Sequence, residues 1–256
     1  MFIRIAFFLI ALLPGVGRLA ACELAAAYTT PEVERLLGGN PDKGLPPLHQ
    51  RLGELSGCTL RMGDYPNPRI WYMFQRGELT LVLGAIASPE RNKAGLFYRM
   101  YHGNLLWVTR RGSPVASGPA ALGSGRLGVL RGTQSTPELL ALQAKLAPSG
   151  QLDYSTGWGM LLKKLEKDRI AATTFVPEIY QSIGPELRAN FDARPAPELG
   201  LIEAGVYLNP ARLPAAERQR LDAALQQMIR ERYITRLMQA ARPATASQPT
   251  PAARQK

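Results

Sequence analysis

Apolar positions along this chain fall into two patterns that alternate from end to end. Short apolar runs are typical of strands, and they cover residues 22–28, 58–62, 79–86, 105–109, 127–130, 170–176 and 199–208. Between them, apolar residues recur at helical spacing over residues 45–56, 70–75, 136–146, 158–167, 177–183 and 221–229. Strands that alternate with helices predict an α/β fold with largely parallel sheets.

Two of these segments show the patterns most clearly. Leu48, Leu52 and Leu55 repeat at i, i+4 and i+7 and are followed by Gly57, which predicts a helix that ends there. Residues 79–86 are almost uniformly apolar, so we expect a central strand that is covered on both faces.

The N-terminal segment 1–21 has the layout of a secretory signal peptide. Arg4 precedes an apolar run over 5–13, and a Pro14-Gly15 break and small residues follow. The run is too short to span a bilayer, which needs about 20 apolar residues. We therefore expect a cleaved signal, export to the periplasm, and a flexible Pro/Ala/Thr-rich tail over 241–256.

The two cysteines have two competing uses. Cys22 and Cys58 each begin an apparent strand, and if these strands are parallel neighbours, the cysteines lie side by side. A disulfide would persist in the periplasm. The alternative is a lipid anchor on Cys22, because Leu19-Ala20-Ala21-Cys22 has the form of a lipoprotein box. The missing spacer after Cys22 favours the disulfide.

Composition and charge remove several function classes. The formal net charge is +11, but five of the basic residues lie in the signal segment and the tail. The remaining excess is modest and scattered, which suits an anionic ligand and does not predict nucleic-acid binding. His49 and His102 have no evident partner, and no metal-ligand spacing, nucleophile elbow or Gly-rich nucleotide loop is present. We therefore expect no enzyme, no metal and no cofactor.

A series of motifs follows this pattern of elements. Segment 74–91 joins a helix end, Gly77-Glu78-Leu79-Thr80, an apolar strand and the loop Ser88-Pro89-Glu90-Arg91. Motifs at 97–101, 128–133 and, more loosely, 161–172 come after it. In order and spacing they resemble the family 3 extracellular solute-binding proteins, the polar amino acid type, over most of residues 22–240.

The resemblance implies a two-lobed periplasmic-binding-protein fold of type II. Each lobe is expected to be a mainly parallel sheet flanked by helices, with two crossings between lobes, the first at 110–114. The expected boundaries are 22–109 with 204–240 for the first lobe and 110–203 for the second. A ligand is held in the interlobe cleft, and the lobes close on it by a hinge.

The resemblance also implies a ligand site. Arg91 matches the arginine that pairs with a ligand carboxylate, through two parallel charge-assisted hydrogen bonds. Thr133 matches a residue that faces the same anion at the start of a helix. Tyr28 stands where an aromatic wall is common, with a core position as the alternative. The predicted set is completed by Ser88, Gly84 and Tyr65, with Trp71, Tyr98 and Tyr101 as weaker candidates.

The sequence also departs from the family pattern. The acidic residue that neutralises a ligand ammonium falls at Val176, with Glu178 close by, and Gly84, Ala85 and Ile86 replace hydroxyl side chains. A carboxylate or another anion therefore fits better than an ordinary α-amino acid. We expect a monomeric binding protein for ABC-type import that serves an inner-membrane permease. The alternatives are a ligand-sensing module that signals to a membrane partner, or a non-transport member of the family.

Overall fold

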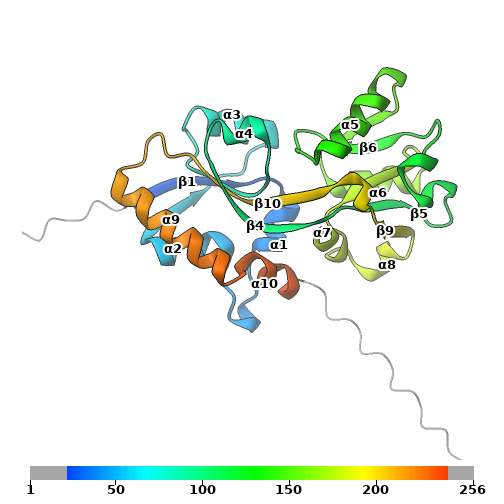
Figure 1. The fold of residues 1–256 in the computed structure, drawn as a ribbon. Coiled ribbons are helices and arrows are strands. Elements are labelled where there is room, and N and C mark those ends of the chain that lie inside the picture. The colour runs from blue at the N-terminus through cyan, green and yellow to red at the C-terminus, as the bar shows by residue number, and fades with distance from the viewer. Residues whose placement is uncertain (1–21, 242–256) are drawn as a thin grey trace, which may run out of the picture.

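Two lobes, each built on a five-stranded sheet, lie side by side in this computed structural model, which describes residues 22–241 (Figure 1). The expected signal peptide at 1–21 and the tail beyond Ala241 lie outside the described residues. Within the described range, no helix is long and apolar enough to cross a membrane.

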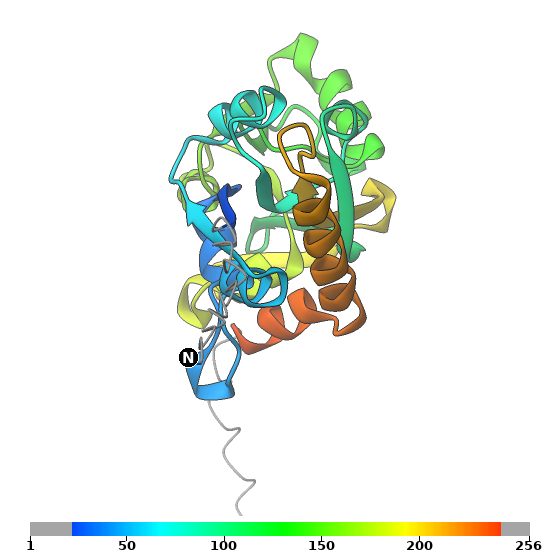
Figure 2. The same ribbon diagram turned by 90° about the vertical axis from the view of Figure 1, so that its left-hand side faces the viewer.

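The first lobe has the strand order β2-β1-β3-β10-β4, in which β10 runs opposite to the other four. Helices cover both faces of this sheet, with α2, α9 and α10 on one face and α3 and α4 on the other (Figures 1 and 2). The strands are β1 (Cys22–Tyr28), β2 (Cys58–Met62), β3 (Leu81–Ile86), β4 (Leu96–Asn104) and β10 (Leu201–Leu208). The helices are α1 (Pro31–Leu37), α2 (Leu48–Ser56), α3 (Asn67–Gln75), α4 (Pro89–Asn92), α9 (Ala215–Arg230) and α10 (Tyr233–Ala240), with the short 3-10 helix η1 (Pro41–Lys43).

The strand β3 is the centre of this lobe. Its side chains alternate between two apolar clusters: Leu81 and Leu83 pack toward α2, and Val82 and Ala85 pack toward α3. All four are fully buried. The prediction of a central strand covered on both faces is therefore confirmed.

The second lobe has the order β7-β6-β8-β5-β9, in which β5 is the strand that runs opposite to the others. Its strands are β5 (Leu106–Arg110), β6 (Leu127–Leu130), β7 (Leu152–Ser155), β8 (Ala172–Phe175) and β9 (Phe191–Pro195). Its helices are α5 (Pro137–Leu146), α6 (Trp158–Glu166), α7 (Pro177–Gln181) and α8 (Pro185–Arg188), with 3-10 helices η2 (Pro114–Ser117), η3 (Pro119–Ala121), η4 (Ala147–Ser149) and η5 (Pro197–Leu199).

The chain crosses between the sheets twice, as expected, but the first crossing comes earlier than predicted. It lies at Leu105, between β4 and β5, because β5 pairs with β8 and β9 in the second sheet. The boundary predicted at residue 109 therefore falls after β5 instead of before it. The return crossing runs through η5 into β10.

The sequence pattern did not predict the helices α1, α4 and α8 or the strands β4, β7 and β9. The strand β4 contains His102. β4 and β9 are edge strands that mix polar and apolar residues, and β9 ends in Pro195. Such strands are defined by pairing with a distant neighbour, which a local pattern does not show.

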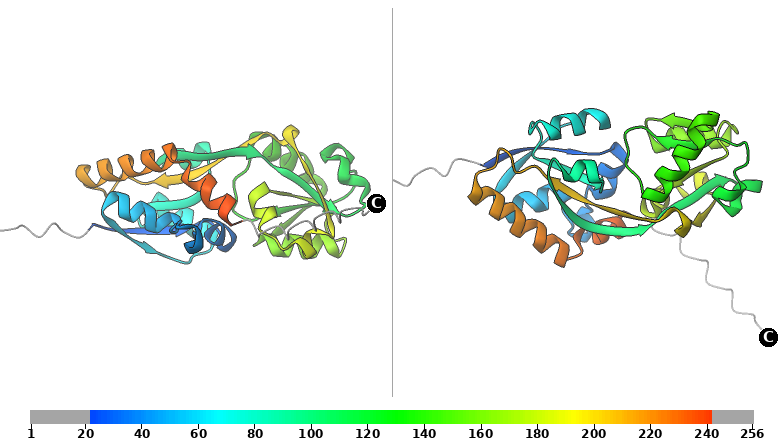
Figure 3. Two further views of the ribbon diagram at one scale, coloured as in Figure 1. Left: turned by 90° about the horizontal axis from the view of Figure 1, so that it is seen from below. Right: turned by 45° about the horizontal axis from the view of Figure 1, so that its top comes forward.

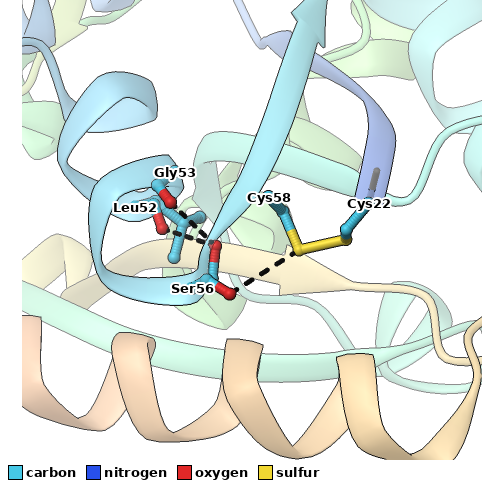
Figure 4. The surroundings of a disulfide bond; sticks show 5 residues. All are labelled: Cys22, Leu52, Gly53, Ser56 and Cys58. Atoms are coloured by element: carbon cyan, nitrogen blue, oxygen red, sulfur yellow. Dashed lines mark hydrogen bonds between the residues drawn. A yellow bond between two sulfur atoms is a disulfide. The ribbon is translucent and has the colours of Figure 1, made fainter. Parts of the chain in front are cut away.

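The two cysteines form the predicted disulfide (Figure 4). Cys22 and Cys58 are direct partners in the parallel pairing of β1 and β2, with their Cα atoms 4.6 Å apart. At the end of α2 beside the bridge, the Ser56 hydroxyl donates to the Leu52 carbonyl at 2.7 Å. A lipid anchor would require the Cys22 sulfur that this bond uses, so the two fates exclude each other.

Removing the bridge should destabilise the first lobe. It closes a loop of 36 residues, and the entropy lost by the unfolded chain corresponds to about 3–4 kcal/mol. We expect the double variant Cys22→Ala/Cys58→Ala to lose roughly this much free energy of unfolding in urea titrations. The wild-type protein should show no free thiol under denaturing, non-reducing conditions. A free thiol, or an unchanged urea midpoint, would contradict the bridge.

Candidate functional site

A cavity of ≈ 60 Å³ lies between the two lobes. The first lobe contributes α1, the ends of β1 and β3, the start of α3, and α10, which reaches the boundary between the lobes (Figure 3). The second lobe contributes the end of β6 and the segment after it, together with α6 and α7. The lining residues are Thr29, Thr30, Val33, Leu36, Leu37, Asn67, Gly84, Ile86, Arg91, Tyr101, Leu130, Thr133, Trp158, Val176, Ile179, Ala204, Gly205, Ile234 and Met238.

Arg91 brings a buried cation to this cavity. It lies in α4, the single turn of helix after β3, and only 6% of the residue is exposed. Its Nη1 donates to the Ile86 carbonyl and its Nη2 to the Gly132 carbonyl, each at 3.1 Å. The second bond joins the lobes, because Gly132 follows β6. The guanidinium is therefore fixed by backbone atoms of both lobes.

Trp71 of α3 supports the same guanidinium from one side. The Arg91 Cζ atom lies 3.5 Å from the centre of the Trp71 ring, in cation–π contact. The Trp71 indole N–H donates to Asn67 Oδ1 at 3.1 Å, and Asn67 Nδ2 donates to the Thr29 carbonyl at 2.9 Å. This chain of hydrogen bonds ties the tryptophan, and with it the arginine, to the end of β1.

The electrostatics of the site are dominated by this one charge. Burial lowers the pKa of Arg91 to about 10, so the side chain stays protonated at neutral pH. No Asp, Glu, Lys or His belongs to the described cavity lining. A buried cation without a counter-charge is costly unless other groups compensate it. The arrangement therefore favours a negatively charged guest.

Thr133 also lines the cavity, but not as a helix start. α5 begins at Pro137, and its cap is Thr136, whose Oγ1 accepts from the Leu139 N–H at 3.1 Å and donates to the Leu199 carbonyl. The expected position of Thr133 at the first turn of a helix is wrong. The residue lies instead in the segment that leads from β6 to α5, next to the Gly132 carbonyl that Arg91 contacts.

Tyr28 and Tyr65 do not line this cavity and instead share a separate hollow beside Asp64. Only 7% of Tyr28 is exposed, and its hydroxyl hydrogen-bonds to Nδ1 of His49 at 3.1 Å. Burial also raises the pKa of the Tyr28 phenol. The structure therefore places Tyr28 in the core, which was the alternative interpretation of this residue.

Ser88 and Gly84 position the arginine loop in different ways. The Ser88 side chain caps α4 by accepting from the Arg91 N–H at 3.3 Å, and it lies outside the cavity lining. Gly84 lines the cavity with a φ of +67°, a conformation that favours glycine. A Cβ at this position would lie 2.2 Å from Cγ1 of Val33.

The weaker aromatic candidates differ in position. Tyr101 of β4 lines the cavity, and its hydroxyl donates to Glu178 of α7 at 2.7 Å, which makes a second bond between the lobes. Tyr98 points toward α9 instead, where its hydroxyl donates to Asp222 at 2.7 Å. Val176, where the family pattern has an acidic residue, lines the cavity with an apolar side chain.

Sequence patterns did not reveal the apolar wall of the site. It comes from α1, α6, α7 and α10, and its main members are Leu36, Leu37, Trp158, Ile179, Ile234 and Met238. No local signal in the sequence shows that Ile234 and Met238 border a cavity instead of the sheet.

Stability should fall in mild acid because of His49. Burial lowers the pKa of its imidazole below the ordinary 6.5. The unfolded chain therefore binds more protons as the pH falls through this range, which destabilises the folded state. We expect urea unfolding at pH 7.5 and 5.5 to show a smaller loss in His49→Gln than in wild type. His102→Gln, at an exposed position of β4, is the matched control; equal losses in all three proteins would contradict this role.

A second prediction concerns Gly84. Gly84→Ala should be more destabilising than Gly112→Ala, although both sites have a positive φ, +67° and +70°. A Cβ at Gly112 meets nothing within 4 Å, so this control carries only the backbone strain, about 1 kcal/mol. At Gly84, overpacking against Val33 should add about 1–3 kcal/mol. Equal urea midpoints for the two variants would show that the Val33 side chain moves aside without lowering the free energy of unfolding.

Solved structures with the same fold are substrate-binding proteins of amino acid ABC transporters. One, from Streptococcus pneumoniae and bound to L-arginine, is 14% identical, with a TM-score of 0.67 over 86% of this chain and 94% of that one. An arginine third transport system periplasmic binding protein from Legionella pneumophila is 17% identical, with a TM-score of 0.63 over 86% and 99%. The ancestral amino acid-binding protein AncCDT-1, a precursor of cyclohexadienyl dehydratase, is 12% identical, with a TM-score of 0.63 over 86% and 95%.

No protein-family model and no curated protein matches the sequence. At this level of identity, the solved structures establish the architecture. The chain has the two-lobed α/β fold of type II periplasmic binding proteins.

Proposed function

We propose that this protein captures a small anionic solute in the cleft between its lobes, with Arg91 as the anion-binding group. The observation that carries the proposal is the buried guanidinium, 6% exposed, that has no acidic residue beside it in the described cavity lining. A carboxylate placed there would supply a negative charge inside the cavity, where no described lining residue is acidic. It would also gain charge-assisted hydrogen bonds in a poorly solvated site.

The guanidinium has donors to spare for such a ligand. Of its five N–H groups, two are used by the carbonyls of Ile86 and Gly132. The Trp71 ring covers one face of the guanidinium plane, so an anion approaches along the plane or from the other face. Thr133, which lines the same cavity from the other lobe, is the proposed hydroxyl partner of the anion.

Capture is coupled to the position of the lobes. Arg91 and Tyr101 of the first lobe donate to Gly132 and Glu178 of the second. The connections between the lobes pass through Leu105 and through η5, where a hinge would act. A solute that contacts both lobes binds the closed arrangement better than the open one and so shifts the population toward it.

In this proposal the protein works outside the inner membrane as the binding component of an importer. The fold is that of ABC transporter substrate-binding proteins, and the sequence begins with the pattern of an export signal. The lobes would then comprise residues 22–104 with 201–240, and 105–200. A sensor that reports the same solute to a membrane partner is the alternative. Catalysis is not favoured, because the described lining offers neither a carboxylate nor an imidazole to act as acid or base.

The proposal predicts a thermal shift that depends on Arg91. The mature protein should be screened against carboxylates, sulfate, phosphate and amino acids, each at millimolar concentration. An anion that binds only the folded protein at 100 times its Kd adds about 2.7 kcal/mol and raises the melting temperature by several degrees. We expect Arg91→Met to abolish this shift and Arg91→Lys to weaken it, because lysine keeps the charge but loses the planar fork.

Arg99→Met is the matched control. Arg99 lies on β4, its side chain is 59% exposed, and it pairs with Glu203 at 2.5 Å outside the cavity. The shift should survive in this variant. A shift that persists in Arg91→Met, or that is lost equally in Arg99→Met, would remove Arg91 from the site.

A further inference from the structure

We infer that the solute is a monocarboxylate with a small apolar body and no amino group. This inference rests on the proposed function and narrows it, since it separates such acids from both α-amino acids and dicarboxylates. It is carried by the charges around the cavity and by the chemistry of the cavity wall.

The described lining holds one charged side chain, Arg91. A monocarboxylate brings one negative charge, and the pair is neutral. An α-amino acid would also bury an ammonium group, and a dicarboxylate a second carboxylate, each without an opposite charge in the lining. Burying an unpaired charge costs several kcal/mol, so both classes should be strongly disfavoured.

Two carboxylates, Glu178 and Glu32, lie near the cavity but outside its described lining. Glu178 accepts the Tyr101 hydroxyl hydrogen bond at 2.7 Å and does not belong to the lining. Glu32 of α1 lies across the cleft at the start of α6, where a Cβ on Gly157 would be 3.5 Å from its Oε1. Gly157 is the cap residue of that helix and supplies no side-chain cap. The helix N-terminus favours the negative charge of Glu32 at this place, and the Glu32 Oε2 atom is buried without a hydrogen-bond partner among the described residues.

The wall of the cavity suits a hydrocarbon group. Val33 and Leu37 face it from α1, Val176 and Ile179 from the start of α7, and Ile234 and Met238 from α10. Each buried methylene contributes about 0.8 kcal/mol to binding in such surroundings. A short branched aliphatic acid fits both the charge and the wall.

Val176 is the residue that sets this preference. It lines the cavity, and it is the residue before α7, with φ −70° and ψ 132° and no side-chain cap. Aspartate and asparagine are favoured at this helix position, and Val176→Asn controls for the cost of placing a polar side chain at a site that is 8% exposed. Only aspartate adds the negative charge that an ammonium group requires.

Isothermal titration calorimetry with paired probes tests the inference. The exported protein is unfolded, washed and refolded with its disulfide oxidised, which removes any solute carried over from cells. The pairs are 3-methylbutanoate with valine and 4-methylpentanoate with leucine, and succinate represents the dicarboxylates. We expect at least one monocarboxylate to bind roughly 100-fold more tightly than its amino acid and than succinate.

The variants Val176→Asp and Val176→Asn test whether the charge at position 176 decides between monocarboxylates and amino acids. In Val176→Asp, we expect the monocarboxylate to bind at least about tenfold more weakly and the matching amino acid more tightly. In Val176→Asn, which has the same size and capping ability without the charge, the amino acid should not gain. A gain of equal size in both variants would overturn the role of charge at this position.

The remaining outcomes separate this inference from the proposed function. If valine, leucine or succinate binds the wild type as tightly as the monocarboxylates, and Arg91→Met abolishes that binding, the inference fails and the proposed function stands. If no probe binds but an anion other than a monocarboxylate gives an Arg91-dependent thermal shift, the inference again fails and the proposed function again stands. If no anion binds with dependence on Arg91, both fail.

Discussion

The site depends on one interaction, the burial of the Arg91 guanidinium against Trp71 without an acidic partner in the described lining. Removing such a charge from water is costly, and the protein offsets the cost with a π face and two backbone carbonyls. These groups hold the cation but do not neutralise it. Because neutral groups hold the guanidinium, its positive charge remains available in the cavity. A cavity with such a charge favours an anionic ligand over a neutral or cationic one.

The same interaction links the site to the two-lobed architecture. The strands β4 and β10 belong to the first sheet and continue directly into the two crossings, and each contributes to the cavity, through Tyr101 and through Ala204 and Gly205. Because Arg91 reaches the Gly132 carbonyl, its position depends on where the second lobe lies. Occupancy of the cavity and the angle between the lobes are therefore coupled through a few hydrogen bonds, which small differences in ligand contact can bias.

The sequence predicted the parts of this design that have a local signature. The apolar run of β3 and the arginine loop are each encoded within a few residues, and each cysteine stands at the start of an apolar run. Arg91, Thr133 and Gly84 do line the cavity. Tyr28 was assigned to the site from its place at the end of a strand, but its hydroxyl hydrogen-bonds to His49, which lies on a different element. The half-polar edge strands β4 and β9 and the wall formed by Ile234 and Met238 arise from contacts far apart in the chain, so no local pattern identifies them.

A single position shows how this fold can change its ligand class without changing its shape. At the start of α7, an acidic side chain would pair with an ammonium group, whereas Val176 presents methyl groups to the same volume. A change between valine and aspartate at this position alters the net charge of the cavity by one unit. In a poorly solvated cleft, the energy of one unpaired charge outweighs that of several methylene contacts. Likeness of fold to amino acid-binding proteins is therefore compatible with a ligand that has no amino group.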